Sequence, residues 1–168
     1  KFSIPKMTAL ISEVSNNTHI FKSGIFDKPE NIVKAKGIVF GNFPSLPTYI
    51  FLCLKEAFGI PTDKVVLAYT GGGEARRAFL AGEINATVCN EGEYRDSFRE
   101  LVQKGEFKLL LQTGIIDEKG NVRATTVFPS DLPTAHELYQ TIYGKQPSGS
   151  AWEAYQALHV VAAGGGKL

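Results

Sequence analysis

The sequence predicts an α/β fold of three layers, in which a largely parallel sheet is flanked by helices. Short apolar runs that suit buried strands alternate along the chain with segments of helical periodicity. Turns rich in glycine, proline and small polar residues separate the two kinds of segment. With 168 residues, 43% of them hydrophobic and 21% charged, the chain is long enough for one domain with a substantial core.

The expected elements cover most of the chain. In order, they are extended segments at 7–14 and 18–22, a short helix at 27–35, a strand at 37–40, a helix at 47–58, a strand at 65–68, a helix at 74–80, a strand at 84–88, a helix at 93–104, a strand at 107–112, and helices at 131–143 and 151–161. Polar turns at 15–17 and 117–121 interrupt the pattern. Alternation of strands and helices is typical of a sheet covered by helices.

Capping residues mark the ends of several helices. Asp27 is expected to cap the first short helix, which has an early proline. Ser45 is the expected cap of the next helix, and Gly59 stands where a left-handed residue ends it. The segment Asp131–Thr134 opens a later helix, again with a proline in the first turn.

The segment Val65–Asn90 is the most informative part of the chain. Its apolar run Val65–Ala68 is typical of a strand buried on both faces. Three glycines at 71–73 come next, followed by helix formers, a C-capping Gly82 and the strand Ile84–Val88. This is a βαβ unit, and its glycine turn places backbone N–H groups at a helix N-terminus, where anions bind.

Composition and charge exclude several functions. The formal net charge of +1 argues against nucleic acid or an anionic membrane as partner. No apolar run reaches the roughly 18 residues of a membrane helix. The first residues lack a secretion signal, so either the protein is cytoplasmic or the signal lies outside this sequence. Cys53 and Cys89 lack metal-site spacing and are expected to be buried thiols rather than a disulfide.

Three turns are expected at the carboxyl edge of the sheet, where α/β proteins bind ligands. They are Gly41–Thr48, Thr70–Gly73 and the strand end at Asn90. The glycine turn has no nucleotide-binding fingerprint, so it is either a purely structural turn or a cradle for an anion. Neutral donors such as Asn42 and Ser45 suit a carboxylate that is bound reversibly and does not react.

Catalytic motifs are weak in this sequence. The histidines at 19, 136 and 159 have no nucleophile motif beside them, and neither GxSxG nor HExxH occurs. Glu91 and Glu93 are a candidate acid–base pair, although a simpler interpretation is that they complement the N-terminus of the following helix. No metal site and no cofactor is expected.

The order of these motifs resembles that of the tripartite tricarboxylate transporter solute receptors, the Bug-type periplasmic solute-binding proteins. The resemblance rests on the GNxPS turn, the segment TGGGEARRAFLAGEINA, the strand ending in Asn90 and the DLPT element at 131–134, and it extends over about residues 11–162. It implies a lobe of the type-2 periplasmic-binding-protein kind, which binds a small organic carboxylate without catalysis and delivers it to a membrane permease.

The resemblance also implies the residues that contact the ligand. They are Gly41, Asn42, Ser45, Thr48, Tyr69, Thr70, Gly71, Gly72 and Asn90. Relatives hold carboxylates with backbone amides, small polar side chains and waters rather than with an arginine clamp. Many have aspartate where this chain has Asn90, so this chain carries one charge less there.

Family members are about twice as long, so the resemblance implies that this chain is mainly the second lobe of a periplasmic receptor. Residues 1–26 are then a crossover region from a first lobe, 27–162 the ligand-binding lobe, and 163–168 a glycine-rich linker or truncated end. Half a cleft should bind weakly. A face left bare by the first lobe would be a surface for self-association, with Trp152 and Tyr155 either covering it or packing in the core.

Two other functions remain open at this stage. One is an enzyme of small-molecule metabolism that uses the same cleft at the strand ends. The other is a sensor module that couples the ligand to a signalling partner. The sequence does not identify the carboxylate or the oligomeric state.

Overall fold

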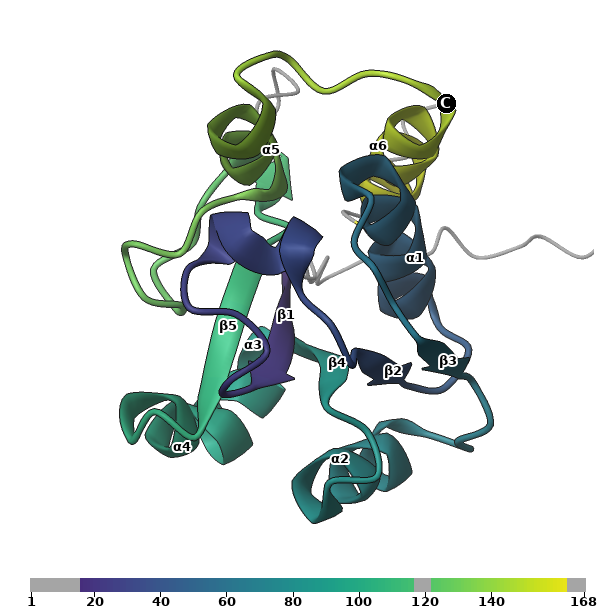
Figure 1. The fold of residues 1–168 in the computed structure, drawn as a ribbon, viewed down its shortest axis with the longest axis vertical. Helices are drawn as coiled ribbons and strands as arrows, with labels where there is room; N and C mark the ends of the chain where they lie inside the picture. The colour runs from purple at the N-terminus through teal and green to yellow at the C-terminus, as the bar shows by residue number, and fades with distance from the viewer. Residues whose placement is uncertain (1–15, 117–121, 163–168) are drawn as a thin grey trace, which may run out of the picture.

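The computed structural model describes residues 16–116 and 122–162 (Figure 1). The expected extended segment at 7–14, the turn at 117–121 and the glycine-rich end at 163–168 lie outside these residues. The strands are β1 (Asn17–Lys22), β2 (Val39–Gly41), β3 (Lys64–Val66), β4 (Ala86–Asn90), β5 (Phe107–Gln112), β6 (Ile115–Ile116) and β7 (Val122–Arg123). The helices are the 3₁₀ helix η1 (Pro29–Lys34), α1 (Leu46–Phe58), α2 (Gly72–Ala81), α3 (Glu91–Glu93), the π-helix η2 (Tyr94–Phe98), α4 (Arg99–Gln103), α5 (Ala135–Tyr143) and α6 (Ser150–Ala162).

Five strands form one sheet in the order β3-β2-β4-β1-β5, and β6 and β7 pair as a separate antiparallel ribbon. In the main sheet β2 pairs in parallel with β3 and β4, whereas β1 is antiparallel to β4 and β5. The prediction of an α/β fold with a sheet flanked by helices is therefore confirmed, and the sheet is mixed, with two parallel and two antiparallel pairings. The central position of β1 and its opposite direction were not predicted, because hydrophobic pattern does not encode strand direction.

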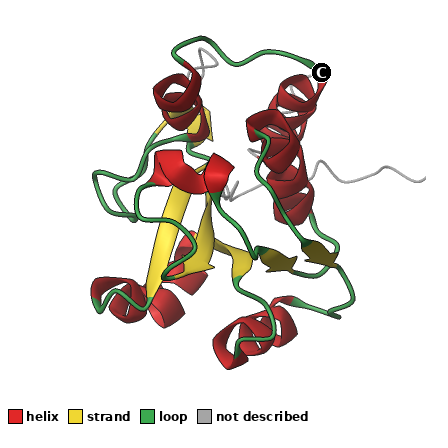
Figure 2. Ribbon diagram, viewed as in Figure 1, coloured by secondary structure: helices red, strands yellow, loops and turns green. Residues whose placement is uncertain are grey.

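The sheet separates two hydrophobic clusters, which gives the three layers (Figure 2). One cluster joins the sheet to η1, α1, α5 and α6, and the other joins it to α2, η2 and the loop around Phe128. Ile20 and Phe21, neighbours in β1, belong to different clusters because successive strand side chains point to opposite faces. Trp152 and Tyr155 are buried in the first cluster, so they pack in the core.

The prediction that Val65–Ala68 is a strand buried on both faces was wrong. The strand is Lys64–Val66, and Val65 is 38% exposed. β3 is the edge strand of the sheet, so only one of its sides is paired. A short apolar run does not by itself distinguish an edge strand from a central one.

The predicted C-terminal caps are confirmed, because Gly59 and Gly82 end α1 and α2 with φ values of 60° and 86°. The helix start predicted at Asp131, with Pro133 in the first turn, was wrong: α5 begins at Ala135, after a capping box formed by Thr134 and Glu137. The cap predicted at Asp27 was wrong, because η1 follows Lys28, whose backbone is extended and which makes no side-chain cap bond.

The single helix predicted at 93–104 is a series of three segments. The π-helix η2 lies between α3 and α4, and it buries both Tyr94 and Phe98. Leu101 and Val102 are half-buried against the second cluster. Among the helices of the described residues, none has both the length and the hydropathy needed to cross a membrane.

Candidate functional site

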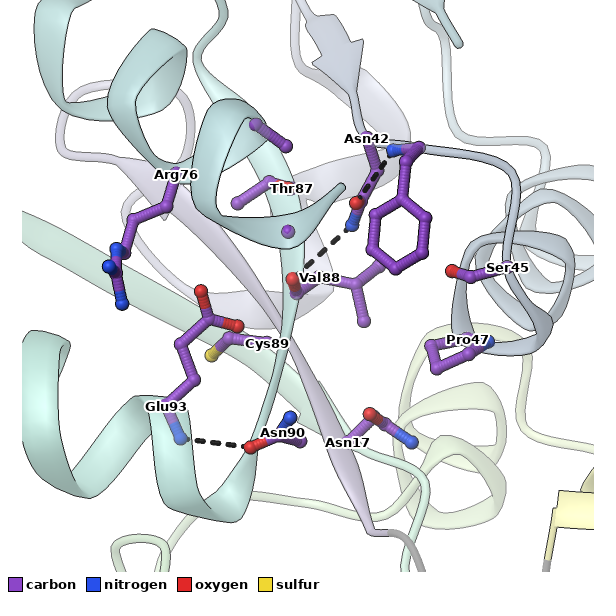
Figure 3. A pocket seen from close by; sticks show the side chains of 13 residues that line it. Asn17, Asn42, Ser45, Pro47, Arg76, Thr87, Val88, Cys89, Asn90 and Glu93 are labelled. Atoms are coloured by element: carbon purple, nitrogen blue, oxygen red, sulfur yellow. Dashed lines mark hydrogen bonds between the residues drawn. The ribbon is translucent and has the colours of Figure 1, made fainter. Parts of the chain in front are cut away.

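A cavity opens at the edge of the sheet where β2 and β4 end and β1 begins (Figure 3). Its empty space is about 470 Å³, part of which is open solvent at the mouth. Its lining residues are Asn17, Asn42, Phe43, Ser45, Pro47, Gly72, Ala75, Arg76, Thr87, Val88, Cys89, Asn90 and Glu93. This is the carboxyl edge of the parallel strands, where the sequence placed the ligand-binding turns.

Asn42 connects three strand ends at the back of the cavity. It is 5% exposed, and its backbone N–H donates to the carbonyl of Val66 at 3.0 Å. Its side-chain Nδ2 donates to the carbonyl of Val88 at 3.4 Å, and its Oδ1 accepts from the backbone N–H of Phe43 at 2.8 Å. These bonds fix the path of the chain from β2 into α1.

Two helix N-termini face the cavity. Ser45 precedes α1, and its hydroxyl is 2.9 Å from that of Thr48, which donates to the carbonyl of Phe43 at 2.8 Å. Gly72 is the first residue of α2, and a Cβ placed there would lie 3.5 Å from the ring of Phe43. The first N–H groups of a helix lack intrahelical partners and carry partial positive charge, so both ends favour an anion.

One cation and one acid line the same cavity. Arg76 comes from α2, and its Nη1 donates to the hydroxyl of Ser97 at 3.1 Å. Glu93 comes from α3, and its backbone N–H donates to the Oδ1 of Asn90 at 2.9 Å. Burial raises the pKa of the Glu93 carboxyl, and the nearby Arg76 charge partly opposes that rise.

Cys89 lines the cavity as a neutral thiol. It is 2% exposed, and burial, with the charge of Glu93, raises its pKa well above the ordinary value. A thiol in that state is a poor nucleophile. Both cysteines are free; the predicted burial holds for Cys89, whereas Cys53 is half-buried. Within the described ranges, no three His, Cys, Asp or Glu side chains gather to hold a metal ion.

Glu91 and Glu93 do not share the cavity. Glu91 is absent from its lining, and its Oε1 accepts a hydrogen bond from Asn16 at 3.2 Å. The structure therefore separates the two carboxylates that the sequence offered as an acid–base pair. Glu93 is left as the single acid of the lining.

Of the nine residues predicted to contact a ligand, four line the cavity: Asn42, Ser45, Gly72 and Asn90. The other five lie outside its lining: Gly41, Thr48, Tyr69, Thr70 and Gly71.

The surroundings of four of these residues differ from those that the sequence led us to expect. Gly41 packs so closely that a Cβ would lie 2.7 Å from the side chain of Ile84 and 3.0 Å from the Tyr69 ring. Thr48 is buried beneath the turn. Thr70 is exposed and donates its N–H and hydroxyl to Glu74 at 2.7 and 2.8 Å, and Gly71 is the extended residue before α2.

Sequence reasoning missed Arg76 and Asn17, and it considered Glu93 only as a partner of Glu91 in an acid–base pair or as a charge beside a helix N-terminus. Arg76 follows Gly72 by four residues, so helical spacing alone places both on one face of α2. Asn17 enters the lining because β1 runs antiparallel beside β4. No local signal in the sequence reports that pairing.

Comparisons with known proteins give matches among solved structures alone. No protein-family model and no curated protein matches the sequence. A periplasmic binding protein, BugD, superposes with a TM-score of 0.53 at 16% identity over 90% of this chain and 51% of its own. A periplasmic transporter superposes with a TM-score of 0.51 at 17% identity, over 88% of this chain and 51% of its own. MatC from Rhodopseudomonas palustris, with bound malate, superposes with a TM-score of 0.50 at 13% identity, over 91% of this chain and 54% of its own.

Two of these structures are described as a periplasmic binding protein and a periplasmic transporter, and the third contains bound malate. The resemblance inferred from the motifs is thus confirmed at the level of the fold. The chain has the α/β fold of Bug-type periplasmic binding proteins, and it spans about half the length of the solved structures that it matches.

Proposed function

We propose that this chain is the ligand-binding lobe of an extracytoplasmic solute receptor and that its cavity binds a small organic carboxylate without chemical change. The observation that carries the proposal is the convergence of two helix N-termini, those of α1 and α2, on one cavity at the carboxyl edge of the sheet. Backbone N–H groups at such ends favour carboxylates. The malate bound to the similar protein MatC supports the same ligand class.

The remaining lining suits reversible binding. Asn42, Ser45 and Asn90 are neutral, and Arg76 contributes a positive charge that is held in place by Ser97. A hydrogen bond to a charged group contributes about 1.5–3 kcal/mol, so a few such bonds give useful affinity without a covalent step. The neutral Cys89 thiol and the separation of Glu91 from Glu93 support binding rather than catalysis.

The extent of the lobe is part of the proposal. It includes β1 (Asn17–Lys22) in addition to the predicted residues 27–162, because β1 pairs with both β4 and β5 in the main sheet. The shares of 51% to 54% of the matched structures support the proposal that this chain is one lobe of a longer receptor. Delivery to a membrane permease, a periplasmic location and self-association through a bare face stay predictions on the same basis.

Calorimetry tests the proposal directly. Mono-, di- and tricarboxylates are titrated into this chain and into the protein encoded by the complete reading frame. We expect saturable binding of at least one acid, weaker in the single lobe because half of the cleft is missing. Absence of saturable binding in both proteins would contradict the proposal. Turnover of a bound acid that is lost in Glu93→Gln would instead support an enzyme.

A further inference from the structure

Glu93 is an acid in a cavity for which we propose an acidic ligand. It is half-buried, and its backbone is fixed by the bond from its N–H to the Oδ1 of Asn90 at 2.9 Å. Its carboxylate accepts no hydrogen bond from any residue of the described ranges, and it is absent from the ion pairs found there. A charged acceptor without a donor in a partly buried place is costly unless a bound molecule supplies the donor.

The groups around Glu93 do not supply that donor. Arg76, on α2, acts on Glu93 through its charge, while its Nη1 donates to Ser97. Cys89, on β4, is a buried neutral thiol. Glu91, on α3, accepts from Asn16, and Arg95, on η2, pairs with Asp96 at 3.3 Å. The lining therefore holds one positive and one negative side chain, and the negative one accepts no hydrogen bond from the described residues.

A bound acid thus meets two unlike regions of the cavity. The N-termini of α1 and α2 and the charge of Arg76 favour a carboxylate. Glu93 repels a second carboxylate and attracts a hydroxyl or ammonium group, because a carboxylate oxygen accepts hydrogen bonds and cannot donate them when ionised. Figure 3 shows Glu93 and Arg76 on one side of the cavity, with Asn42 and Ser45 across it.

We propose that Glu93 determines specificity, and that the cavity selects acids with a hydrogen-bond donor, a hydroxyl or an ammonium group, beside the carboxylate. This inference rests on the proposed function. It deepens that function, because it names the chemical class of the ligand: hydroxy acids or amino acids, in preference to plain dicarboxylates of the same length.

The test compares acids that differ only in the donor. Succinate, malate and aspartate form one set, and glutarate, 2-hydroxyglutarate and glutamate form another. Each is titrated calorimetrically at neutral pH into the wild type, Glu93→Gln and the control Glu100→Gln, whose exposed carboxylate lies on α4 away from the cavity. The wild type and the control should bind the donor-bearing acid at least about tenfold more tightly than the plain one. In Glu93→Gln the ratio should fall close to one.

The titrations distinguish an ammonium donor from a hydroxyl donor. They also distinguish a failure of this inference from a failure of the proposed function. Tighter binding of the amino acid than of the hydroxy acid assigns the donor as ammonium, and the reverse assigns it as hydroxyl. An unchanged ratio in Glu93→Gln, with acids still bound, would overturn the inference and leave the proposed function standing. If none of these six acids binds while another carboxylate does, the inference alone is overturned; if no carboxylate binds either this chain or the protein encoded by the complete reading frame, both are overturned.

A readout in the wild type covers the case in which Glu93→Gln does not fold. Malate and succinate differ only in the hydroxyl group, so the wild type alone should bind malate at least about tenfold more tightly than succinate. Equal affinities of the wild type for the two acids would overturn the inference, whether or not the variant folds.

Discussion

Asn17 and Asn90 lie opposite each other on the antiparallel strands β1 and β4, and both line the cavity. On its other side, Asn17 is held by Thr113: its N–H donates to the Thr113 hydroxyl at 3.0 Å, and its carbonyl accepts from the Thr113 N–H at 2.8 Å. The wall of the cavity thus depends on the register of a strand that comes from the beginning of the chain. A slip of one residue would turn every β1 side chain to the other face of the sheet.

Replacing Asn42 by alanine should weaken both the fold and ligand binding. The change removes the acceptor of the Phe43 N–H and the donor to the Val88 carbonyl, in a side chain that is 5% exposed. Leaving buried polar groups unpaired costs about 1–3 kcal/mol of unfolding free energy. Urea unfolding measures that loss, and calorimetry measures binding. Asn31→Ala, at an exposed position of η1, is the control and should change neither.

His19 should make the protein sensitive to acid. Both ring nitrogens are buried without a hydrogen-bond partner in the described structure, the ring packs edge-on against Phe51 at 5.0 Å, and burial lowers its pKa from 6.5 to about 3. Because the folded state disfavours the proton, this stability is fully present above pH 6.5 and is lost as the pH falls toward 3. Near pH 4.5 the loss should be on the order of 2–3 kcal/mol.

Unfolding free energies measured in urea at a series of pH values test the role of His19. The variant His19→Phe removes the titrating ring and keeps its size, so its stability should change less between neutral pH and about pH 4.5 than that of the wild type. His136→Gln, at a half-buried position on α5, is the matched control. An acid response that is the same in His19→Phe and in the wild type would assign the effect to other groups.

Sequence reasoning succeeded where the signal is local. Gly59 and Gly82 end their helices as predicted, and β5 covers the predicted residues, because capping and short-range periodicity depend on neighbouring residues. It failed where the outcome depends on distant partners. Val65 is exposed because β3 lies at the sheet edge. The missed lining residue Asn17 owes its place to the pairing of β1 with β4.

The turns that contain Gly41 and Gly72 show the same contrast between local and distant determinants. Both were predicted to contact the ligand through free backbone groups, yet Gly41 is enclosed by Ile84 and Tyr69, whereas Gly72 faces the cavity. Glycine serves tight packing and exposed turns alike, so its presence in a sequence does not distinguish the two. The difference comes from the side chains that the fold brings against each position.

Gly41→Ala should therefore destabilise the protein by about 1–3 kcal/mol, because the added methyl group would overlap the Ile84 side chain. Ile84 is itself buried, so the test is a double-mutant cycle in urea: Gly41→Ala should cost less in the Ile84→Ala background than in the wild type. Gly73→Ala is the control, because a Cβ there meets no atom within 4 Å. If Gly41→Ala is as stable as Gly73→Ala, the close packing at Gly41 is refuted.

Gly72→Asp should leave the fold intact and remove the binding of carboxylates. A Cβ at this position lies at ordinary contact distance from Phe43, and the residue is the first of α2, where a negative charge interacts favourably with the helix dipole. The unfolding free energy should thus stay within about 1 kcal/mol of the wild type. In the cavity, however, the same charge would occupy the place that we propose for the carboxylate of the ligand.

The matched control for this variant is Gly73→Asp. It adds the same charge to the same helical turn, but residue 73 does not line the cavity and a Cβ there meets no atom within 4 Å. We expect carboxylate affinity to fall by more than about tenfold in Gly72→Asp and by much less in Gly73→Asp, since exposed charges are screened by solvent and salt. Calorimetry with an acid that the wild type binds measures both. Equal losses in the two variants would show that charge near α2, rather than occupation of the cavity, weakens binding.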